Sequence, residues 1–100
     1  MNASVDPRVL AEIWAVICSR AENPTPDSYT SRLLTDKKGI DKLLEKVGEE
    51  ATEFILAVKN GDDPRAVEET ADLLYHILVA LRGAGIGFAD VIRELERRRT

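Results

Sequence analysis

Residues 40–82 decide the fold, and they read IDKLLEKVGEEATEFILAVKNGDDPRAVEETADLLYHILVALR. Apolar residues recur every three or four positions through both halves of this stretch, which is the pattern of an amphipathic helix. The Asn-Gly pair ending at Gly61 is typical of a helix C-terminus. Asp63 is a capping residue, and the proline after it suits a first helical turn. The stretch therefore predicts two consecutive helices, residues 40–59 and 63–82, joined by a tight turn.

The flanking sequence predicts two further helices. Asp6-Pro7 opens the first of them, which ends before the breaker Asn23-Pro24-Thr25-Pro26. The second covers about 88–98. The polar residues 27–38 are expected to hold one or two helical turns that begin near Ser28. No segment has the pattern of a strand, so the sequence predicts an all-α fold, a helical bundle of four main helices in a single domain spanning residues 1–100.

The composition narrows the classes of protein to consider. The chain has 100 residues, of which 44% are hydrophobic and 32% charged, as in a folded protein. A domain this small buries limited apolar surface alone, so a homodimer is expected to complete the bundle. The net charge of −4 disfavours a nucleic-acid partner. No apolar run reaches the roughly 18 residues of a membrane span. The single Cys18 is expected to be reduced and buried in a cytoplasmic protein.

Acidic and basic side chains share one face of the predicted helix 40–59. At about 100° per residue, this face spans roughly 100° of the helix. Glu50 and Glu53 lie three residues apart, so their carboxylates can bind one ion. Lysines beside such a pair suit the polyphosphate oxygens that a metal leaves free. Glutamates at helical spacing often line a solvated face instead, so this motif alone does not establish a site. The face consists of Lys42, Lys46, Glu49, Glu50 and Glu53.

The predicted helix 63–82 is apolar around most of its circumference, yet Glu69, Asp72 and His76 lie within about 60° of one another on the remaining stripe. Burying an unpaired carboxylate is costly, so either Lys and Arg side chains or a metal ion must neutralise the stripe. Mg²⁺ suits a cluster of carboxylates without cysteine when phosphates complete its shell. Acidic pairs on adjacent antiparallel helices can meet at one place, which predicts a metal site.

Two runs, KVGEEATE at 46–53 and ETADLLYH at 69–76, resemble the phosphoribosyl-ATP pyrophosphohydrolases of histidine biosynthesis. These enzymes belong to the MazG-like superfamily of all-α nucleotide pyrophosphohydrolases. Ser28-Tyr29-Thr30 and the segment from Asp90 to Leu95 add to the resemblance. The superfamily's ExxE…ExxD pattern is met by Glu50, Glu53, Glu69 and Asp72. The resemblance implies a homodimer that hydrolyses phosphoribosyl-ATP to phosphoribosyl-AMP and pyrophosphate, the second step of L-histidine biosynthesis.

The resemblance also suggests roles for the residues. Mg²⁺ bound by the four carboxylates would bridge triphosphate oxygens, which makes Glu50 a catalytic candidate. Glu49 is a candidate general base or further metal ligand, and Lys42 and Lys46 would hold phosphates. Ser28, Tyr29, Thr30 and His76 are candidates for substrate contact. The structural alternatives are that residues 28–30 cap a short helix and that His76 is a histidine satisfied beside a carboxylate.

Three other functions fit parts of the pattern. A house-cleaning pyrophosphatase of the same superfamily would hydrolyse dNTPs and ignore phosphoribosyl-ATP. A non-catalytic helical module would pair its acidic stripe with lysines of a partner, and magnesium would not change its stability. A di-iron carboxylate bundle requires Glu-x-x-His pairs, but Leu73 stands three residues before the only histidine. This last alternative is therefore excluded.

Overall fold

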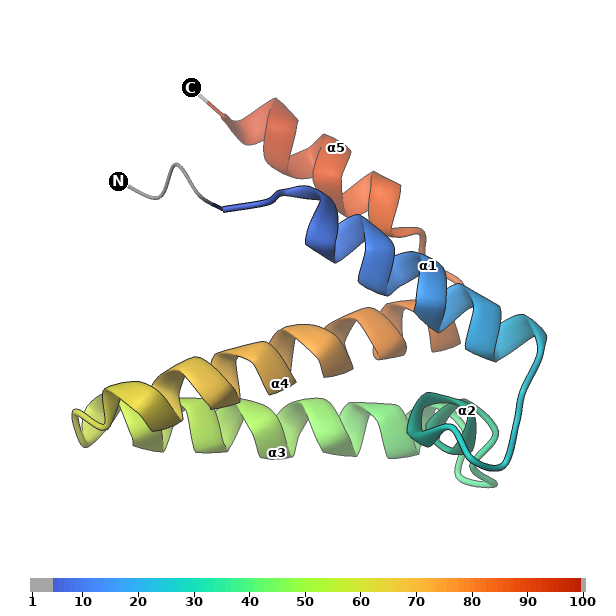
Figure 1. The fold of residues 1–100 in the computed structure, drawn as a ribbon, viewed down its shortest axis with the longest axis horizontal. Helices are drawn as coiled ribbons and strands as arrows, with labels where there is room; N and C mark the ends of the chain where they lie inside the picture. The colour runs from blue at the N-terminus through green and yellow to red at the C-terminus, as the bar shows by residue number, and fades with distance from the viewer. Residues whose placement is uncertain (1–4, 100) are drawn as a thin grey trace.

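The computed structural model describes residues 5–99, which form five helices connected by short turns (Figure 1). The helices are α1 (Arg8–Glu22), α2 (Tyr29–Leu34), α3 (Ile40–Lys59), α4 (Asp63–Gly83) and α5 (Phe88–Arg98). No strand occurs among the described residues. The predicted all-α fold is confirmed. The polar segment after Ser28 forms a helix of six residues, so the bundle has a short fifth helix beside the four main ones.

α3 and α4 form an antiparallel hairpin that positions the acidic residues (Figure 1). Gly61 reverses the chain with a φ of 71°, a conformation that costs glycine little. The cap of α4 is Asp62, whose carboxylate accepts a hydrogen bond from the backbone N–H of Arg65 at 3.2 Å. Our choice of Asp63 as the cap was therefore wrong by one residue, since Asp63 already lies in the first helical turn.

The buried core is small and draws on four helices. It consists of Ile17, Leu33, Leu43, Leu78, Val79 and Ala80. Trp14 of α1 packs against Phe88 with ring centroids 5.8 Å apart, which holds the start of α5 near α1. Cys18 is only half-buried, so the expectation of a buried cysteine was wrong. A core of this size leaves much of the apolar surface of α4 and α5 uncovered.

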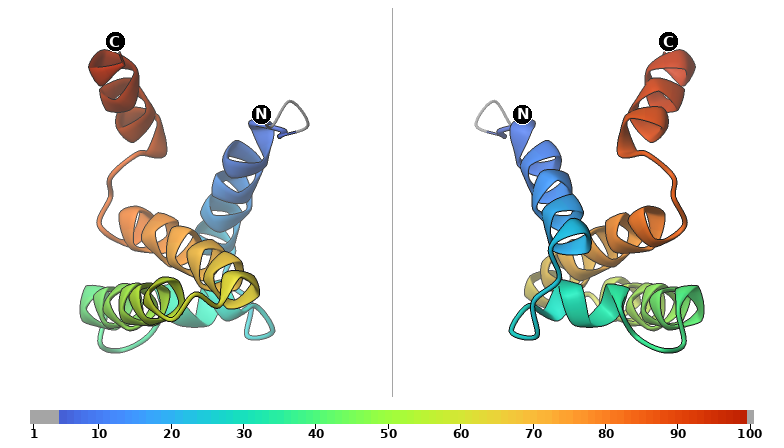
Figure 2. Two further views of the ribbon diagram at one scale, coloured as in Figure 1. Left: turned by 90° about the vertical axis from the view of Figure 1, so that its left-hand side faces the viewer. Right: turned by 90° about the vertical axis from the view of Figure 1, so that its right-hand side faces the viewer.

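α5 leaves the hairpin at a sharp angle and projects from the rest of the molecule (Figure 2). The chain bends by 117° between α4 and α5, and no residue of α5 is buried. Over residues 5–99, no single helix is both long and apolar enough to cross a membrane; only α4 and α5 taken together, as a bent pair, meet the requirement of length and composition.

Candidate metal and phosphate site

Three of the four predicted metal ligands converge where α3 faces α4. Glu50 of α3 and Glu69 and Asp72 of α4 each place one carboxylate oxygen within 4.8 Å of the other two. Glu50 and Glu69 are buried, with 8% and 4% of their surface exposed, whereas Asp72 is exposed. The cluster therefore has a buried floor and an opening to solvent on the side of Asp72.

The remaining two acidic candidates lie at the edge of this cluster. Glu53 is exposed and outside the group of three, although its charge helps to raise the pKa values of Glu50 and Glu69. Glu49 is also exposed and forms an ion pair with Lys46 at 3.2 Å. The structure thus brings Glu53 beside the cluster, whereas Glu49 is paired with Lys46.

The buried carboxylates lack the partners that would stabilise their charge. In the described part of the chain, Glu50 Oε2 and Glu69 Oε1 are buried without any hydrogen-bond partner. Burial is the main cause that raises the pKa of each group, and neighbouring negative charges raise it further. The other oxygen of Glu69 forms an ion pair with Arg65 Nε at 2.9 Å. A positive charge between these oxygens would remove an unfavourable arrangement.

The donor set fits a small divalent cation. All three groups offer carboxylate oxygens, the ligands that Mg²⁺ prefers. In an octahedral shell with ligands about 2.1 Å from Mg²⁺, neighbouring oxygens lie about 3.0 Å apart and opposite ones about 4.2 Å apart, so the three carboxylates would draw closer to share one ion. The open side at Asp72 leaves room for the water or phosphate ligands that Mg²⁺ usually keeps.

Two basic residues, Lys46 and Arg65, lie beside the cluster. Lys46 is half-buried, and its pKa is raised mainly by Glu49, with smaller contributions from Tyr29 and Glu50. Lys46 is therefore a charged group beside the carboxylates. Lys42 lies one turn earlier on α3 and is also half-buried. Arg65, which was not predicted from the sequence, pairs with Glu69 and helps to line a cavity of about 280 Å³ that Glu53 also lines. Its spacing of four residues before Glu69 was the available signal.

The four candidates for substrate contact lie in different structural environments. Ser28 caps α2, because its Oγ accepts a hydrogen bond from the backbone N–H of Ser31 at 3.1 Å. Thr30 is buried. The His76 Nδ1 lies 2.7 Å from the backbone oxygen of Asp72 and must donate to it, since a carbonyl only accepts. In the neutral tautomer, Nε2 then accepts from the Tyr29 hydroxyl at 3.0 Å. His76 thereby links α2 to the turn of α4 that carries Asp72.

Comparisons with known proteins identify the family. Residues 10–99 match the family described as phosphoribosyl-ATP pyrophosphohydrolase. The chain is 67% identical to the phosphoribosyl-ATP pyrophosphatase of Methanoregula boonei over 95 residues, which cover 95% of this chain and 91% of the relative. It is 57% identical to the protein of the same name from Methanoculleus marisnigri, over 94% of this chain and 97% of the relative.

A third relative is the histidine biosynthesis bifunctional protein HisIE of Gloeobacter violaceus. The identity is 49% over 90% of this chain, but the match covers only 39% of that longer protein. The converging carboxylates stand in the runs that resembled this family. The chain belongs to the phosphoribosyl-ATP pyrophosphohydrolase family.

Proposed function

We propose that this chain hydrolyses phosphoribosyl-ATP between its α and β phosphates, giving phosphoribosyl-AMP and pyrophosphate in histidine biosynthesis. Membership of the family, whose description names this substrate, supports the proposal. The structural observation that carries it is the pair of buried, unpartnered oxygens of Glu50 and Glu69 beside Asp72. Buried carboxylate oxygens without a partner destabilise the folded protein, but they suit a site that binds a cation together with a triphosphate.

We further propose that the reaction depends on Mg²⁺ held by Glu50, Glu69 and Asp72, with Glu53 turning in from the edge. When bound, the ion would supply charge neutralisation on the triphosphate and the leaving pyrophosphate. The two half-buried lysines of α3, Lys42 and Lys46, would hold the phosphate oxygens that the ion leaves free. The position of Lys46 beside Glu50, with Lys42 one turn before it on α3, supports this role.

The ion pair between Lys46 and Glu49 suggests how the attacking water loses its proton. With substrate bound, Lys46 would turn from Glu49 to a phosphate oxygen, since a phosphate carries more charge than a carboxylate. The carboxylate of Glu49, 60% exposed, would then be free to accept a proton from a water that attacks phosphorus. Arg65 would similarly release Glu69 to the ion and face the phosphates.

The direct test measures pyrophosphate release by the wild type and by Glu50→Gln and Asp72→Asn with phosphoribosyl-ATP and Mg²⁺. Each variant is expected to lose about 100-fold or more in kcat, the usual effect of removing a group that stabilises developing charge. Glu96→Gln on exposed α5 is the matched control and should retain activity. Rates near that of the wild type in both site variants would rule out the metal assignment.

A substrate panel separates the proposed function from its closest rival. The wild type should hydrolyse phosphoribosyl-ATP far better than any dNTP. A preference for dNTPs would instead favour a house-cleaning pyrophosphatase. A non-catalytic module would release pyrophosphate from neither, and Mg²⁺ would leave its thermal stability unchanged.

A further inference from the structure

The candidate metal site has a counterion of its own. Arg65 Nε lies 2.9 Å from Glu69 Oε2, and the two residues stand one helical turn apart on α4. Of the three converging carboxylates, Glu69 is the only one that forms an ion pair within residues 5–99. Lys46, the other basic residue beside the cluster, pairs with Glu49 instead. Arg65 is therefore the one cation of the described chain that pairs with a proposed metal ligand.

The charge of Arg65 stabilises Glu69 only in part. The Glu69 side chain is 6% exposed, whereas that of Arg65 is 55% exposed, so water weakens the attraction between the two groups. Burial and the neighbouring Glu53 and Glu50 raise the pKa of Glu69 by more than the charge of Arg65 lowers it. Glu69 Oε1 also lacks a hydrogen-bond partner. The pair thus leaves the carboxylate able to exchange Arg65 for a stronger counterion.

A divalent cation at the cluster competes with this ion pair. A guanidinium on one oxygen of Glu69 lies close to any ion on the other oxygen, and the two positive charges repel each other strongly where water is excluded. An ion that binds Glu69 must therefore either bear this repulsion or displace Arg65 into solvent. Both lower the affinity for the ion as long as Arg65 has no other partner.

A polar cavity gives Arg65 a place to turn to. The cavity has a volume of about 280 Å³, and Arg65 is the only positively charged residue among the described residues that line it. Glu53 also lines it and acts on the pKa values of Glu50 and Glu69, so the cavity adjoins the cluster. A triphosphate that shares an ion with the cluster can therefore meet the guanidinium on this side.

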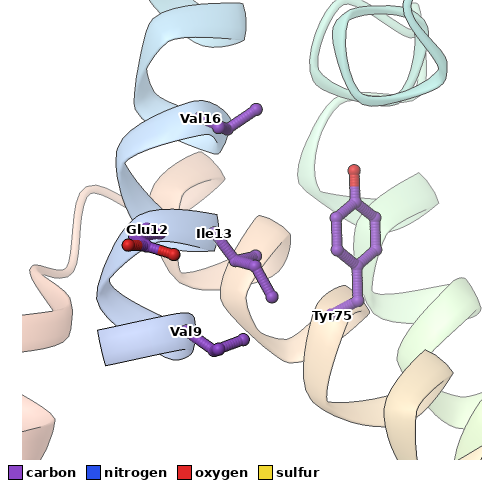
Figure 3. A pocket seen from close by; sticks show the side chains of 5 residues that line it. All are labelled: Val9, Glu12, Ile13, Val16 and Tyr75. Carbon is purple, nitrogen blue, oxygen red and sulfur yellow. The ribbon is translucent and has the colours of Figure 1, made fainter. Parts of the chain in front are cut away.

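A larger pocket elsewhere on α4 offers phosphates no such partner. It has a volume of about 400 Å³ and lies between α1 and α4 (Figure 3). Figure 3 shows aliphatic side chains of α1 that point toward the Tyr75 ring of α4. The one charged residue among the described residues of its lining is the acidic Glu12. Burying a triphosphate against apolar groups and a carboxylate is unfavourable, which leaves the cavity of Arg65 as the place for the phosphates.

We propose that Arg65 makes the binding of the metal and of the triphosphate depend on each other. Without nucleotide, Arg65 pairs with Glu69 and weakens the binding of the ion. With nucleotide bound, the guanidinium turns to a phosphate oxygen and releases Glu69 to the ion. The coupling is reciprocal, because each ligand must raise the affinity for the other by the same factor. This inference rests on the proposed function, which supplies both the metal and the triphosphate.

Nucleotide binding with and without Mg²⁺ measures this coupling. The probe is α,β-methylene-ATP, which cannot be hydrolysed at its α–β bridge, titrated by NMR in EDTA or in saturating Mg²⁺. Arg65→Gln should weaken binding in Mg²⁺ by about tenfold or more, since a hydrogen bond between charged groups is lost. In EDTA the variant should bind nearly as tightly as the wild type, because Glu69 then holds Arg65. Equal weakening under both conditions would indicate a merely structural role and would overturn the proposal.

The affinity for a metal alone should change in the opposite direction. In calorimetry without nucleotide, Arg65→Gln should bind Mn²⁺ about fivefold more tightly than the wild type, because the competing ion pair is gone. Lys46→Gln is the matched control. It also removes a positive charge beside the cluster, but Lys46 pairs with Glu49 and not with one of the three converging carboxylates, so its gain should be smaller. Equal gains would show a general effect of charge and contradict the exchange of partners.

Arg65→Lys provides a second test that does not depend on the folding of Arg65→Gln. Lysine keeps a positive charge beside Glu69 but lacks the planar fork that binds phosphate through two hydrogen bonds. The affinity for Mn²⁺ alone should therefore stay near that of the wild type. Binding of α,β-methylene-ATP should weaken in Mg²⁺ and not in EDTA. A loss of the same size under both conditions would again contradict the proposal.

Activity of the wild type separates failure of the inference from failure of the proposed function. A wild type that does not hydrolyse phosphoribosyl-ATP contradicts the function, and with it the inference. An active wild type whose Arg65→Gln variant keeps the same ratio between its nucleotide affinities in Mg²⁺ and in EDTA contradicts the inference alone.

Discussion

Glu50 and Glu69 hold the buried side-chain oxygens that lack a hydrogen-bond partner among the described residues. Each is buried, each has an oxygen without a partner, and each lies near the negative charges of its neighbours. Arg65 compensates only one oxygen of Glu69. The raised pKa values of the two groups mean that the folded protein holds their protons more tightly than the unfolded chain does. The metal-free protein therefore gives up stability when both groups are ionised.

This imbalance predicts a dependence of stability on pH and magnesium. Without metal, the free energy of unfolding should fall as pH rises from about 4.5, the ordinary pKa of a glutamate, through the raised pKa values of the folded state. The sign follows because the folded state binds more protons than the unfolded state in this window. Mg²⁺ binds the ionised carboxylates. The rise in the protein's Tm on adding Mg²⁺ should therefore be small near pH 4.5 and become larger as pH rises.

Thermal unfolding at a series of pH values, with EDTA or with Mg²⁺, measures both effects. Glu50→Gln is the informative variant, because it removes one of the titrating groups and should flatten the pH dependence of the metal-free protein. A gain in Tm from Mg²⁺ that is absent, or equal at all pH values, would contradict this account of the cluster.

At the scale of single residues, local contacts could be predicted from the sequence, but contacts between residues far apart in the chain could not. The convergence of Glu50 with Glu69 and Asp72 followed from helical spacing and one tight turn, because both are local properties of the sequence. The bond from Tyr29 to His76 joins residues 47 positions apart and has no local signal. Arg65 has a local signal, its spacing of four residues before Glu69, so this ion pair could have been predicted.

At the scale of elements, the close approach of α3 and α4 depends on Gly83. A Cβ at Gly83 would overlap Cδ1 of Leu43, which is buried in the first turns of α3. Gly48, in the middle of α3, has no atom within 4 Å of such a Cβ. The two glycines therefore serve different purposes, although both lie within helices and have negative φ.

Substitution of these glycines by alanine should have opposite effects. Gly83→Ala is expected to lower the free energy of unfolding by about 1 kcal/mol, because overpacking of about 1–3 kcal/mol outweighs a gain of about 1 kcal/mol in helix propensity. Gly48→Ala should raise it by up to about 1 kcal/mol, since only the propensity changes. Urea unfolding of both variants measures the difference. Equal effects at the two positions would show that Leu43 moves aside freely.

The helices themselves could be predicted well because their signals are local. The apolar period and the Asn-Gly pair set α3 and the start of α4 to within one residue. The error at the cap of α4 arose because two aspartates precede Pro64, and only the backbone geometry selects Asp62. The sharp departure of α5 had no sequence signal beyond Gly85 and Gly87, which allow a turn without fixing its angle.

At the scale of the whole molecule, one face of α4 has no covering element. Val67, Leu74 and Ile77 are 71%, 46% and 37% exposed and follow one another at helical spacing. Ile92 and Leu95 of α5 are also exposed. An apolar surface of this kind on a small domain favours association. We propose that a second copy of the chain covers the face of α4, as the resemblance to the family led us to expect.

A charge on this face should separate the subunits. Leu74→Glu is expected to give a monomer in light scattering where the wild type is a dimer, because association would bury an unpaired carboxylate. Leu44→Glu, at a position on α3 that is 54% exposed, is the matched control and should remain dimeric. A monomeric wild type, or equal behaviour of the two variants, would contradict the proposed interface.

The central claim is that Glu50, Glu69 and Asp72 hold one divalent cation, and an anomalous difference map from crystals soaked in Mn²⁺ tests it most directly. We expect one strong peak within bonding distance of all three carboxylates, with Glu53 turned toward it. A map without a peak at this place, or with Arg65 still paired to Glu69 and the ion bound elsewhere, would contradict the claim.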